Sequence, residues 1–233
     1  MRGHLPSDPM LRMLIDATAV SLAVCTAARA QPSPRLFVGA AAGISTLSAD
    51  ARSEFTPAGV GVSLYKPENG PALNVFFGVH LHDYVTVQAN YVWNRNEVVL
   101  TSVRASEAGP AFYEQPRTAS QHALVADLLA YFRERRSAVR PYLSVGLGVV
   151  RLYTKDAGQS RVRNTLQPPT NIQTTRPMLR VAVGIDVALG RGWGARYSFS
   201  ESVSGNPISA QLWPQGQRGL ANFQNLFGIV RAF

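Results

Sequence analysis

The chain has 233 residues, 46% of them hydrophobic, and a formal net charge of +9 at pH 7. Its length suits one or two domains, and it contains no run of 18 or more uncharged apolar residues, which argues against a helical membrane protein. A membrane protein built from strands is not excluded, because such strands alternate apolar and polar residues and each gives a weak hydropathy signal.

The N-terminal segment predicts a cleaved signal peptide. Arginines precede an apolar stretch at residues 17–28, which ends in the small-x-small sequence Ala28-Arg29-Ala30. We therefore expect residues 1–30 to be removed and the mature protein to begin at Gln31 outside the cytoplasm. A short amphipathic helix is the alternative interpretation of this segment.

The only cysteine, Cys25, falls within the predicted signal peptide. The mature chain is therefore expected to have no disulfide, no cysteine-containing zinc site and no cysteine nucleophile. Lipidation at Cys25 is a less favoured alternative, because Val24 is a poor residue before a modified cysteine. Loss of residues 1–30 removes three arginines and two aspartates and leaves a net charge of +8. In this compartment the basic surface favours lipid phosphates over nucleic acid.

Alternation of apolar and polar residues predicts eight strands. In residues 179–189 every second residue, from Leu179 to Leu189, is aliphatic, while Arg180, Gly184 and Asp186 lie between them. A period of two is typical of a strand with two different faces. The eight expected strands span residues 35–47, 74–81, 85–93, 121–133, 143–149, 179–189, 193–199 and 220–233.

The connections between these strands alternate between short and long. The long ones, near residues 48–72, 102–119, 154–174 and 202–219, are rich in Pro, Gly, Ser, Asn and Gln, so we expect irregular loops there. An even-stranded outer-membrane barrel with both termini in the periplasm has this pattern, with tight turns on one side and long loops on the other. The sequence thus predicts an all-β fold: an eight-stranded antiparallel up-and-down transmembrane β-barrel over residues 31–233.

Two segments, Arg140–Val150 and Val183–Tyr197, together with the terminal Phe233, resemble the small eight-stranded outer-membrane β-barrels of the OmpA type. The resemblance implies a place in the outer membrane of a Gram-negative cell envelope. It also implies that the last strand is read by the barrel assembly machinery through its terminal aromatic and the alternating apolar residues before it. The matching positions are Phe223, Phe227, Ile229 and Phe233, whereas Asn225 and Arg231 depart from the pattern. Longer members carry a peptidoglycan-binding domain, an activity not expected of this chain.

Charged residues on the lumen face predict an interior polar network. By their parity we expect Asp127, Arg180, Asp186, Arg196 and Glu201 to point into the barrel, where eight strands leave just enough room for side chains. Buried charges must be paired or hydrogen bonded. A turn centred near residue 191 places Asp186 and Arg196 at equal offsets, which predicts a cross-strand ion pair.

Aromatic residues near strand ends predict contacts with the two membrane interfaces. These interfacial aromatics are Tyr91, Trp93, Phe132 and Trp193, with Phe223 as a further member. The basic residues of the long connections are interpreted as solvated side chains with acidic neighbours such as Glu54, Glu107 and Asp156, and contact with lipopolysaccharide phosphates is the alternative. These basic residues are Arg52, Arg104, Arg117, Lys155, Arg161, Arg163 and Arg218.

No motif identifies a reaction. The mature histidines are His80, His82 and His122; His122 lies near Ser120, and Glu201 offers only loose proximity to this pair, so we expect no catalytic residues, no metal site and no cofactor. The leading hypothesis is a non-enzymatic outer-membrane barrel with a closed or narrow lumen and an envelope-structural or surface-interaction role.

The alternatives are a small passive channel or ligand carrier, a barrel-borne lipid A-modifying enzyme, and a soluble lipocalin-like barrel. The expected partners are outer-membrane lipid, lipopolysaccharide and the barrel assembly machinery. We expect no nucleic acid, and the chain is expected to be a monomer.

Overall fold

The computed structural model describes residues 35–57, 59–107, 109–164 and 166–233. The predicted signal peptide, residues 1–30, and its cleavage point lie outside the described residues. Among the residues described, no helix is long and apolar enough to cross a membrane.

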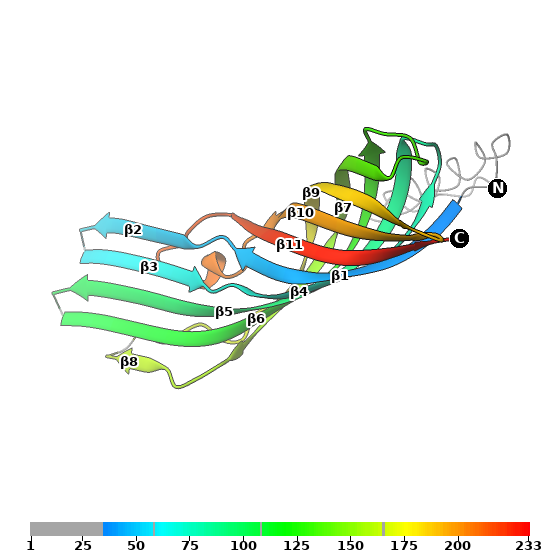
Figure 1. Ribbon diagram of the computed structural model, residues 1–233. Coiled ribbons are helices and arrows are strands. Elements are labelled where there is room, and N and C mark those ends of the chain that lie inside the picture. Colours follow the sequence, from blue (N-terminus) through cyan, green and yellow to red (C-terminus); the bar gives the residue numbers. More distant parts are fainter. Residues whose placement is uncertain (1–34, 58, 108, 165) are drawn as a thin grey trace, which may run out of the picture. The chain divides into compact units, whose positions relative to one another are not determined.

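The described residues fold into strands with one short 3-10 helix, η2 (Ser209–Gln211). Figure 1 shows them coloured along the chain. The strands are β1 (Arg35–Leu47), β2 (Asp50–Thr56), β3 (Gly59–Pro67), β4 (Gly70–His80), β5 (Val85–Ser106), β6 (Gly109–Tyr131), β7 (Val139–Asp156), β8 (Arg161–Arg163), β9 (Gln173–Gly190), β10 (Trp193–Gly205) and β11 (Gly219–Ala232).

Eight strands close into an antiparallel ring in the order β1, β4, β5, β6, β7, β9, β10 and β11, and β11 pairs again with β1. This confirms the predicted eight-stranded up-and-down barrel. A walk along paired residues from Leu36 on β1 returns to β1 at Thr46, ten residues further along. Such a stagger requires the strands to tilt against the barrel axis. One row of paired residues therefore rises along the axis as it passes round the ring.

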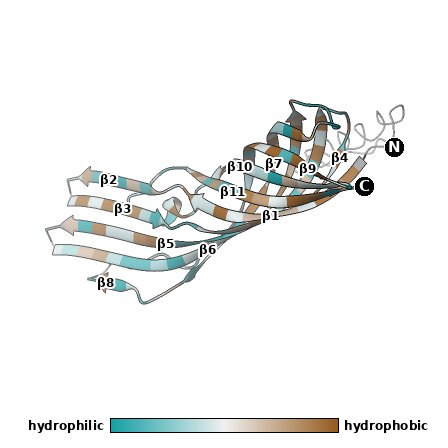
Figure 2. Ribbon diagram, in the orientation of Figure 1, coloured by the Kyte–Doolittle hydropathy of each residue, from teal (hydrophilic) through white to brown (hydrophobic). Residues whose placement is uncertain are grey.

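The two faces of each ring strand carry different residues, as the alternation predicts. Figure 2 shows the hydropathy of each residue along the strands. Apolar side chains such as Val75, Leu147 and Val181 are exposed on the outer face, whereas polar ones such as Gln88 and Asn90 are buried inside. In an outer-membrane barrel the apolar outer face contacts lipid and the polar face lines the interior.

The prediction of irregular loops at residues 48–72 and 102–119 is wrong. The hairpin of β5 and β6 stays paired far beyond the ring, from Val85 with Ala130 to Ser106 with Gly109. β3 pairs with the outer half of β5, β2 pairs with β3, and β8 pairs with β6. These five strands form an extension sheet beyond one end of the ring, called here the extension end (Figure 1).

The residues of the extension sheet explain why it forms. β-branched residues recur along it, as in Val60, Val62 and Val103, and such residues favour strands. Gly59 and Gly109 lie at its hairpin turns with φ of 132° and 102°, a region that favours glycine. The Pro and Gly content thus marks tight turns between strands. Residues 154–174 and 202–219 contain β8, η2 and irregular backbone, so the prediction holds there only in part.

The opposite end of the ring carries the short turns and the end of β11, and is called here the turn end. The turn between β9 and β10 contains Gly190, Arg191 and Gly192, all with positive φ. The backbone N–H of Phe233 donates to the carbonyl oxygen of Leu36 at 2.9 Å, which joins the C-terminus to the first residues of β1. The ring is therefore closed up to its last residue.

Candidate functional site

The interior next to the turn end is built around one ion pair. Arg196 on β10 lies opposite Asp186 on β9 in the register. Its Nε donates to Asp186 Oδ1 at 2.6 Å and its Nη2 donates to Asp186 Oδ2 at 2.7 Å. Tyr131 donates its hydroxyl to Asp186 Oδ2 at 2.8 Å, and Arg196 Nη1 donates to Gln88 Oε1 at 2.6 Å. The bidentate geometry gives a strong charge-assisted contact.

Aromatic rings surround the guanidinium of Arg196. Its Cζ lies 4.6 Å from the ring centroid of Phe76, 5.1 Å from that of Tyr142 and 5.6 Å from that of Phe37. These rings fill the lumen at this level and add cation–π attraction. Sequence reasoning did not identify them. The sequence pattern that could have identified them is that these aromatic residues alternate onto the inner face, where glycines on neighbouring strands leave room for their rings. A Cβ at Gly78 would clash with Phe37, and one at Gly184 would clash with Tyr142.

A second ion pair lies inside the ring and is joined to the first. Arg180 Nη1 donates to Asp127 Oδ2 at 2.9 Å, and both side chains are buried. Asn90 Nδ2 also donates to Asp127 Oδ2, at 3.1 Å, and Gln88 Nε2 donates to Asn90 Oδ1 at 2.6 Å. Gln88 also accepts from Arg196, so four of the five charged residues predicted to point into the barrel lie in one connected set. These four are Asp127, Arg180, Asp186 and Arg196.

A recess of about 210 Å³ opens at the turn end and is lined by Asp186 and Arg196 together with His80, Arg135 and Arg140. Arg140 Nη2 donates to the backbone carbonyl of Asp83 at 2.9 Å, and its guanidinium lies 3.7 Å from the ring centroid of Tyr131. The first ion pair and the ring of Phe37 therefore line this recess.

Between the second ion pair and the extension end, the interior is first lined by apolar side chains and then by amide side chains. Val92, Val125 and Met178 belong to a buried apolar cluster. Beyond them, Asn222 Nδ2 donates to Asn94 Oδ1 at 3.1 Å and to Gln121 Oε1 at 2.9 Å. These contacts join side chains from β5, β6 and β11 across the lumen.

The mouth at the extension end is filled by an apolar core, called here the mouth core. Its buried members are Leu47, Tyr65, Val98, Leu100, Tyr113, Ala119, Leu152, Ile172, Ile208, Leu212 and Leu220. Burial raises the pKa of the Tyr65 hydroxyl, so this residue stays neutral. Strands alone do not supply this core, because Ile172, Ile208 and Leu212 come from the connections before β9 and β11.

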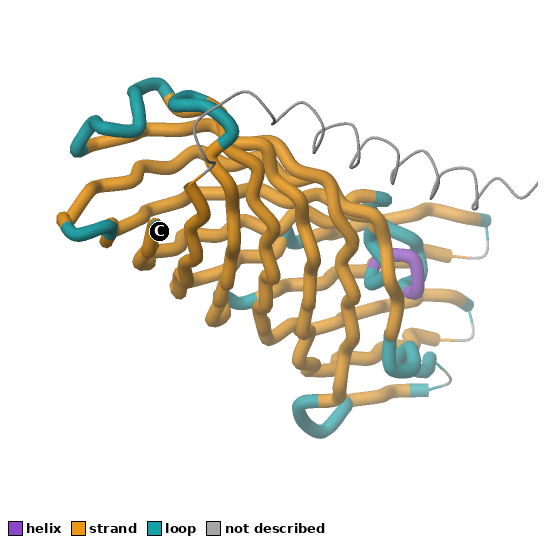
Figure 3. Tube along the Cα trace, turned by 90° about the vertical axis from the view of Figure 1, so that its right-hand side faces the viewer, coloured by secondary structure: helices purple, strands orange, loops and turns teal. Residues whose placement is uncertain are grey.

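The connection between β10 and β11, residues 206–218, is fastened onto the extension sheet. Figure 3 shows η2, drawn in purple, within this connection. Asp50 on β2 accepts from the Ser209 hydroxyl at 2.5 Å and from the Gln217 backbone N–H at 2.6 Å. The guanidinium of Arg104 stacks on Trp213 at 4.0 Å from the ring centroid. These contacts hold the connection over the mouth.

Arg117 binds the connection between β8 and β9. The prediction that Arg117 is a solvated loop residue is wrong. Only 2% of its surface is exposed. It donates to Gln115 Oε1 at 2.8 Å, to Thr154 Oγ1 at 3.1 Å and to the carbonyl oxygen of Thr170 at 2.9 Å, and it also contacts the Pro169 carbonyl. Burial lowers the pKa of its guanidinium, and the nearby carboxylate of Asp156 opposes this shift.

Glu201 does not point into the lumen, so its predicted place in the interior network is wrong. On β10 it shares the outward parity of Phe199, and it pairs in register with Val181 and Phe223, which are also outward positions. It borders an apolar surface with Leu128, Leu143 and Phe199. The same alternation that assigns Arg196 to the lumen assigns Glu201 to the lipid side.

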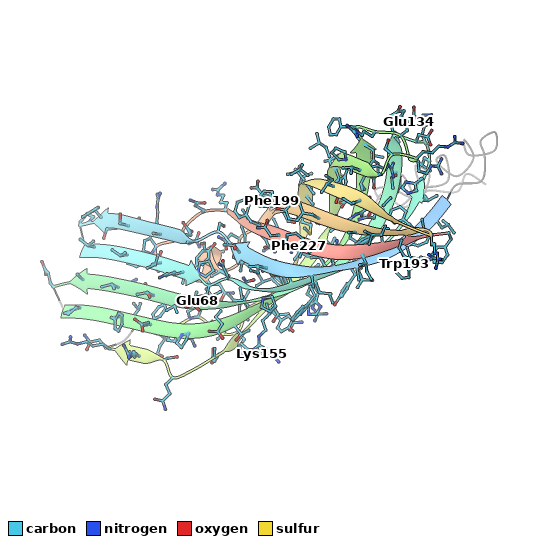
Figure 4. All side chains as sticks on the ribbon, viewed as in Figure 1. Glu68, Glu134, Lys155, Trp193, Phe199 and Phe227 are labelled. Atoms are coloured by element: carbon cyan, nitrogen blue, oxygen red, sulfur yellow. The ribbon has the colours of Figure 1, made fainter. Side chains whose placement is uncertain are left out.

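The residues of the predicted assembly signal share the outer face of β11. Phe227 is 67% exposed and Phe233 is 71% exposed, with Ile229 between them and Phe223 nearer the extension end. The predicted interfacial aromatics are also outward. Phe132 and Trp193 lie at the turn end, and Tyr91 and Trp93 lie in the half nearer the extension end. Figure 4 shows Trp193 at the turn end, with Phe227 and Phe199 further along the ring.

The histidine-based catalytic arrangement is not assembled in the described residues. His122 lies on the outer face of β6, where its Nδ1 is 2.7 Å from the Tyr91 hydroxyl. Glu201 lies on β10, separated from β6 by β7 and β9. Among the same residues, no group of three or more His, Cys, Asp or Glu side chains is arranged to hold a metal ion.

A closed eight-stranded antiparallel ring with an apolar outer face and a polar interior defines an outer-membrane β-barrel. Residues 17–216 match the family described as outer membrane protein beta-barrel domain, and the chain belongs to this family. It is accordingly an outer-membrane protein of the Gram-negative cell envelope. No curated protein sequence matches the chain.

Solved structures of small outer-membrane barrels are similar in fold. OprG from Pseudomonas aeruginosa aligns with a TM-score of 0.51 at 13% identity, over 85% of this chain and 96% of that chain. Neisserial surface protein A aligns with a TM-score of 0.49 at 16% identity, over 85% and 97%. The attachment invasion locus protein Ail of Yersinia pestis, solved with the heparin analogue sucrose octasulfate, aligns with a TM-score of 0.43 at 10% identity, over 85% and 99%.

Proposed function

We propose that this protein is a non-enzymatic outer-membrane barrel with a closed lumen that presents its extension sheet at the cell surface. The observation that carries the closed lumen is the filling of the ring by two linked ion pairs and, at the extension end, by the mouth core. An eight-stranded barrel has an interior just wide enough for its side chains, so these groups leave no wide path for ions.

Planar-bilayer recording of the reconstituted protein tests the closed lumen. We expect no large, steady single-channel currents. A matched variant with residues 207–217 removed separates the two barriers: it lacks the connection over the mouth but keeps both ion pairs, and it is expected to stay non-conducting. Large, steady currents from the unaltered protein would overturn the proposal and favour the passive channel.

A surface-interaction role is supported by side chains on the outward face of the extension sheet. Phe55 on β2 is 81% exposed, and Val62 and Leu64 on the neighbouring β3 are exposed on the same face. Solvent-exposed large apolar side chains gathered on one surface are typical of interaction sites. An envelope-structural role needs no such surface, so this group of residues favours the surface-interaction alternative.

Cysteine labelling of intact cells tests whether the extension sheet faces outward. The mature chain as predicted has no cysteine, so Phe55→Cys gives a single thiol at the extension end and Ser137→Cys a single thiol at the turn end. We expect a membrane-impermeant maleimide to label the first variant on intact cells and the second only after permeabilisation. The reverse result would place the extension sheet in the periplasm and end the surface role.

The absence of enzymatic activity is proposed because His122 and Glu201 lie apart on the outside of the ring. Mass spectra of lipid A from cells with and without the protein test this point. We expect identical acyl and phosphate compositions. A reproducible mass change that requires the protein would instead support the lipid A-modifying enzyme.

We further propose that residues 1–30 are cleaved, that the outward residues of β11 guide assembly by the barrel assembly machinery, and that the folded protein is a monomer. Intact and native mass spectrometry of protein from the envelope test the first and third points, with Gln31 expected as the first residue and one chain per particle. Deletion of Phe233 is expected to lower the yield of folded, heat-modifiable barrel. Unchanged yield would remove support for the assembly signal.

A further inference from the structure

The outer surface of β6 and β7 carries a groove near the extension end. It is lined by His122, Arg151, Tyr153, Lys155, Asn171 and Gln173, has a volume of about 630 Å³, and is called here the β6–β7 groove. His122 and Arg151 lie opposite each other in the register of the two strands. The ring of His122 stacks on that of Tyr153 at a centroid distance of 5.7 Å. Two cations and two aromatic rings thus share one surface.

The cations of this groove have no carboxylate in ion-pair contact within the part of the chain that the structure describes. The ion pairs there involve other basic residues, and the nearest acidic residue in sequence, Asp156, pairs with Arg117 at 3.5 Å. Lys155 lies 5.8 Å from the ring centroid of Tyr153 and is exposed (Figure 4). Two exposed cations without a counter-charge favour an anionic ligand.

Directly below the groove, the same two strands present a continuous apolar column. The next outward pairs toward the turn end are Leu124 with Val149, Ala126 with Leu147 and Leu128 with Val145. Leu124 is 62% exposed and Leu147 is 70% exposed. A basic groove above an apolar column matches an amphiphile that has an anionic head and acyl chains.

The groove lies at the outer boundary of the lipid-facing belt. The outward apolar residues of this column begin at Phe132 and end at Leu124. That distance is about 26 Å along the strand at the usual rise per residue, and about 20 Å along the barrel axis at a typical tilt of about 40°. The apolar band of such barrels is about 25 Å tall. His122 and Arg151 therefore lie at the depth of lipid headgroups.

We propose that the β6–β7 groove binds the phosphorylated headgroup of an outer-leaflet lipid, whose acyl chains lie along the column from Leu124 to Leu128. Arg151 offers a planar fork that suits two phosphate oxygens, and Lys155 adds a second charge-assisted contact. The Tyr91 hydroxyl holds the ring of His122 beside them. This site goes beyond the proposed surface role and does not depend on the closed lumen.

Native mass spectrometry of the refolded protein in detergent tests the site, with bis-phosphorylated lipid A and chemically dephosphorylated lipid A as probes. We expect the unaltered protein to bind one phosphorylated molecule at least about tenfold more tightly than the dephosphorylated one, the change expected from about 1.4 kcal/mol of lost headgroup contact. This comparison needs no variant. Equal affinity for the two lipids would overturn the proposal.

Variants locate the binding on the ring. Arg151→Gln with Lys155→Gln is expected to weaken lipid A binding at least about tenfold, whereas the matched double change Arg161→Gln with Arg163→Gln, which removes the same charge from β8, is expected to leave it within about twofold. Heat-modifiability on gels checks that each variant folds, and Lys155→Gln alone replaces the double variant if that one does not. An equal loss in the groove and control variants would overturn the assignment.

A competition experiment distinguishes a lipid-binding site from a site for small anions. Inorganic phosphate in large molar excess is expected not to displace lipid A, because it lacks acyl chains to contact the apolar column. Complete displacement by inorganic phosphate would identify a site for small anions and overturn the lipid assignment.

Discussion

The two ends of the barrel interior are filled by different chemistry. Near the turn end, Asp186 and Arg196 form an ion pair. Side chains on surrounding strands donate hydrogen bonds to this pair or place aromatic rings beside it. At the extension end, the mouth core is mostly aliphatic, and part of it comes from connections that fold back over the strands, including Ile172 and Ile208. The first region depends on specific partners, and the second depends on filled volume.

This difference predicts which substitutions should destabilise the ring and which should affect only the mouth. A buried charge that loses its partner carries a large desolvation cost, and both members of the first pair belong to ring strands. A buried aliphatic side chain that is shortened leaves a cavity whose cost depends on how far the surroundings relax. Because Ile208 belongs to a connection, its loss is expected to open the mouth while the ring persists. The predictions below run from the largest expected effect to the smallest.

The largest effect is expected from breaking the Asp186–Arg196 pair. Asp186→Ala or Arg196→Ala should lower the free energy of unfolding by about 3 to 5 kcal/mol, because the remaining charge is left without its partner. The double variant should lose less than the sum of the single losses. Urea unfolding in micelles, analysed as a double-mutant cycle, measures this coupling. Strictly additive losses would contradict the pairing.

Ile208→Ala is expected to cost about 2 to 4 kcal/mol locally through a cavity in the mouth core. Limited proteolysis should then cut within residues 206–218, while the ring remains heat-modifiable. Phe55→Ala, which removes an exposed side chain of the extension sheet, serves as the control and should leave the cleavage pattern unchanged. Loss of the whole barrel in the Ile208 variant would show that the mouth and the ring unfold together.

Arg117→Lys keeps the charge but removes the planar fork that contacts several acceptors. We expect a local loss of about 1 to 2 kcal/mol, since two or more charge-assisted hydrogen bonds are replaced by fewer. Hydrogen exchange of residues 166–172 should become faster, and exchange in β9 near Arg180 should not change. Unaltered exchange at residues 166–172 would mean that Arg117 does not hold this connection.

The smallest effect is expected on the outer face. Glu201→Leu should raise the free energy of unfolding by up to about 1 kcal/mol, because charged side chains on the lipid face near a membrane interface are mildly destabilising. Urea midpoints in lipid vesicles measure this change, and Glu201→Gln separates charge from shape. A destabilised Leu variant would indicate that Glu201 has a stabilising polar contact that the leucine removes.

The sequence by itself determined the ring and its two faces. A period of two assigns each residue to lipid or lumen, and a tight turn at residues 190–192 places Asp186 opposite Arg196. The same parity rule, applied correctly to β10, places Glu201 on the outer face. Our prediction assigned it to the lumen, which is wrong. Local alternation is sufficient for these features because facing in a strand depends only on parity.

Only the tertiary structure decided how the connections fold and what fills the lumen. Composition rich in Pro and Gly is compatible with both a loop and a hairpin, and the choice at residues 102–119 depended on pairing between β5 and β6 over their full length. The burial of Arg117 and Ile208 depends on contacts with strands far away in the chain. Sequence periodicity reports the face on which a residue lies, but its burial depends on which distant residues close over it, and this requires the folded chain.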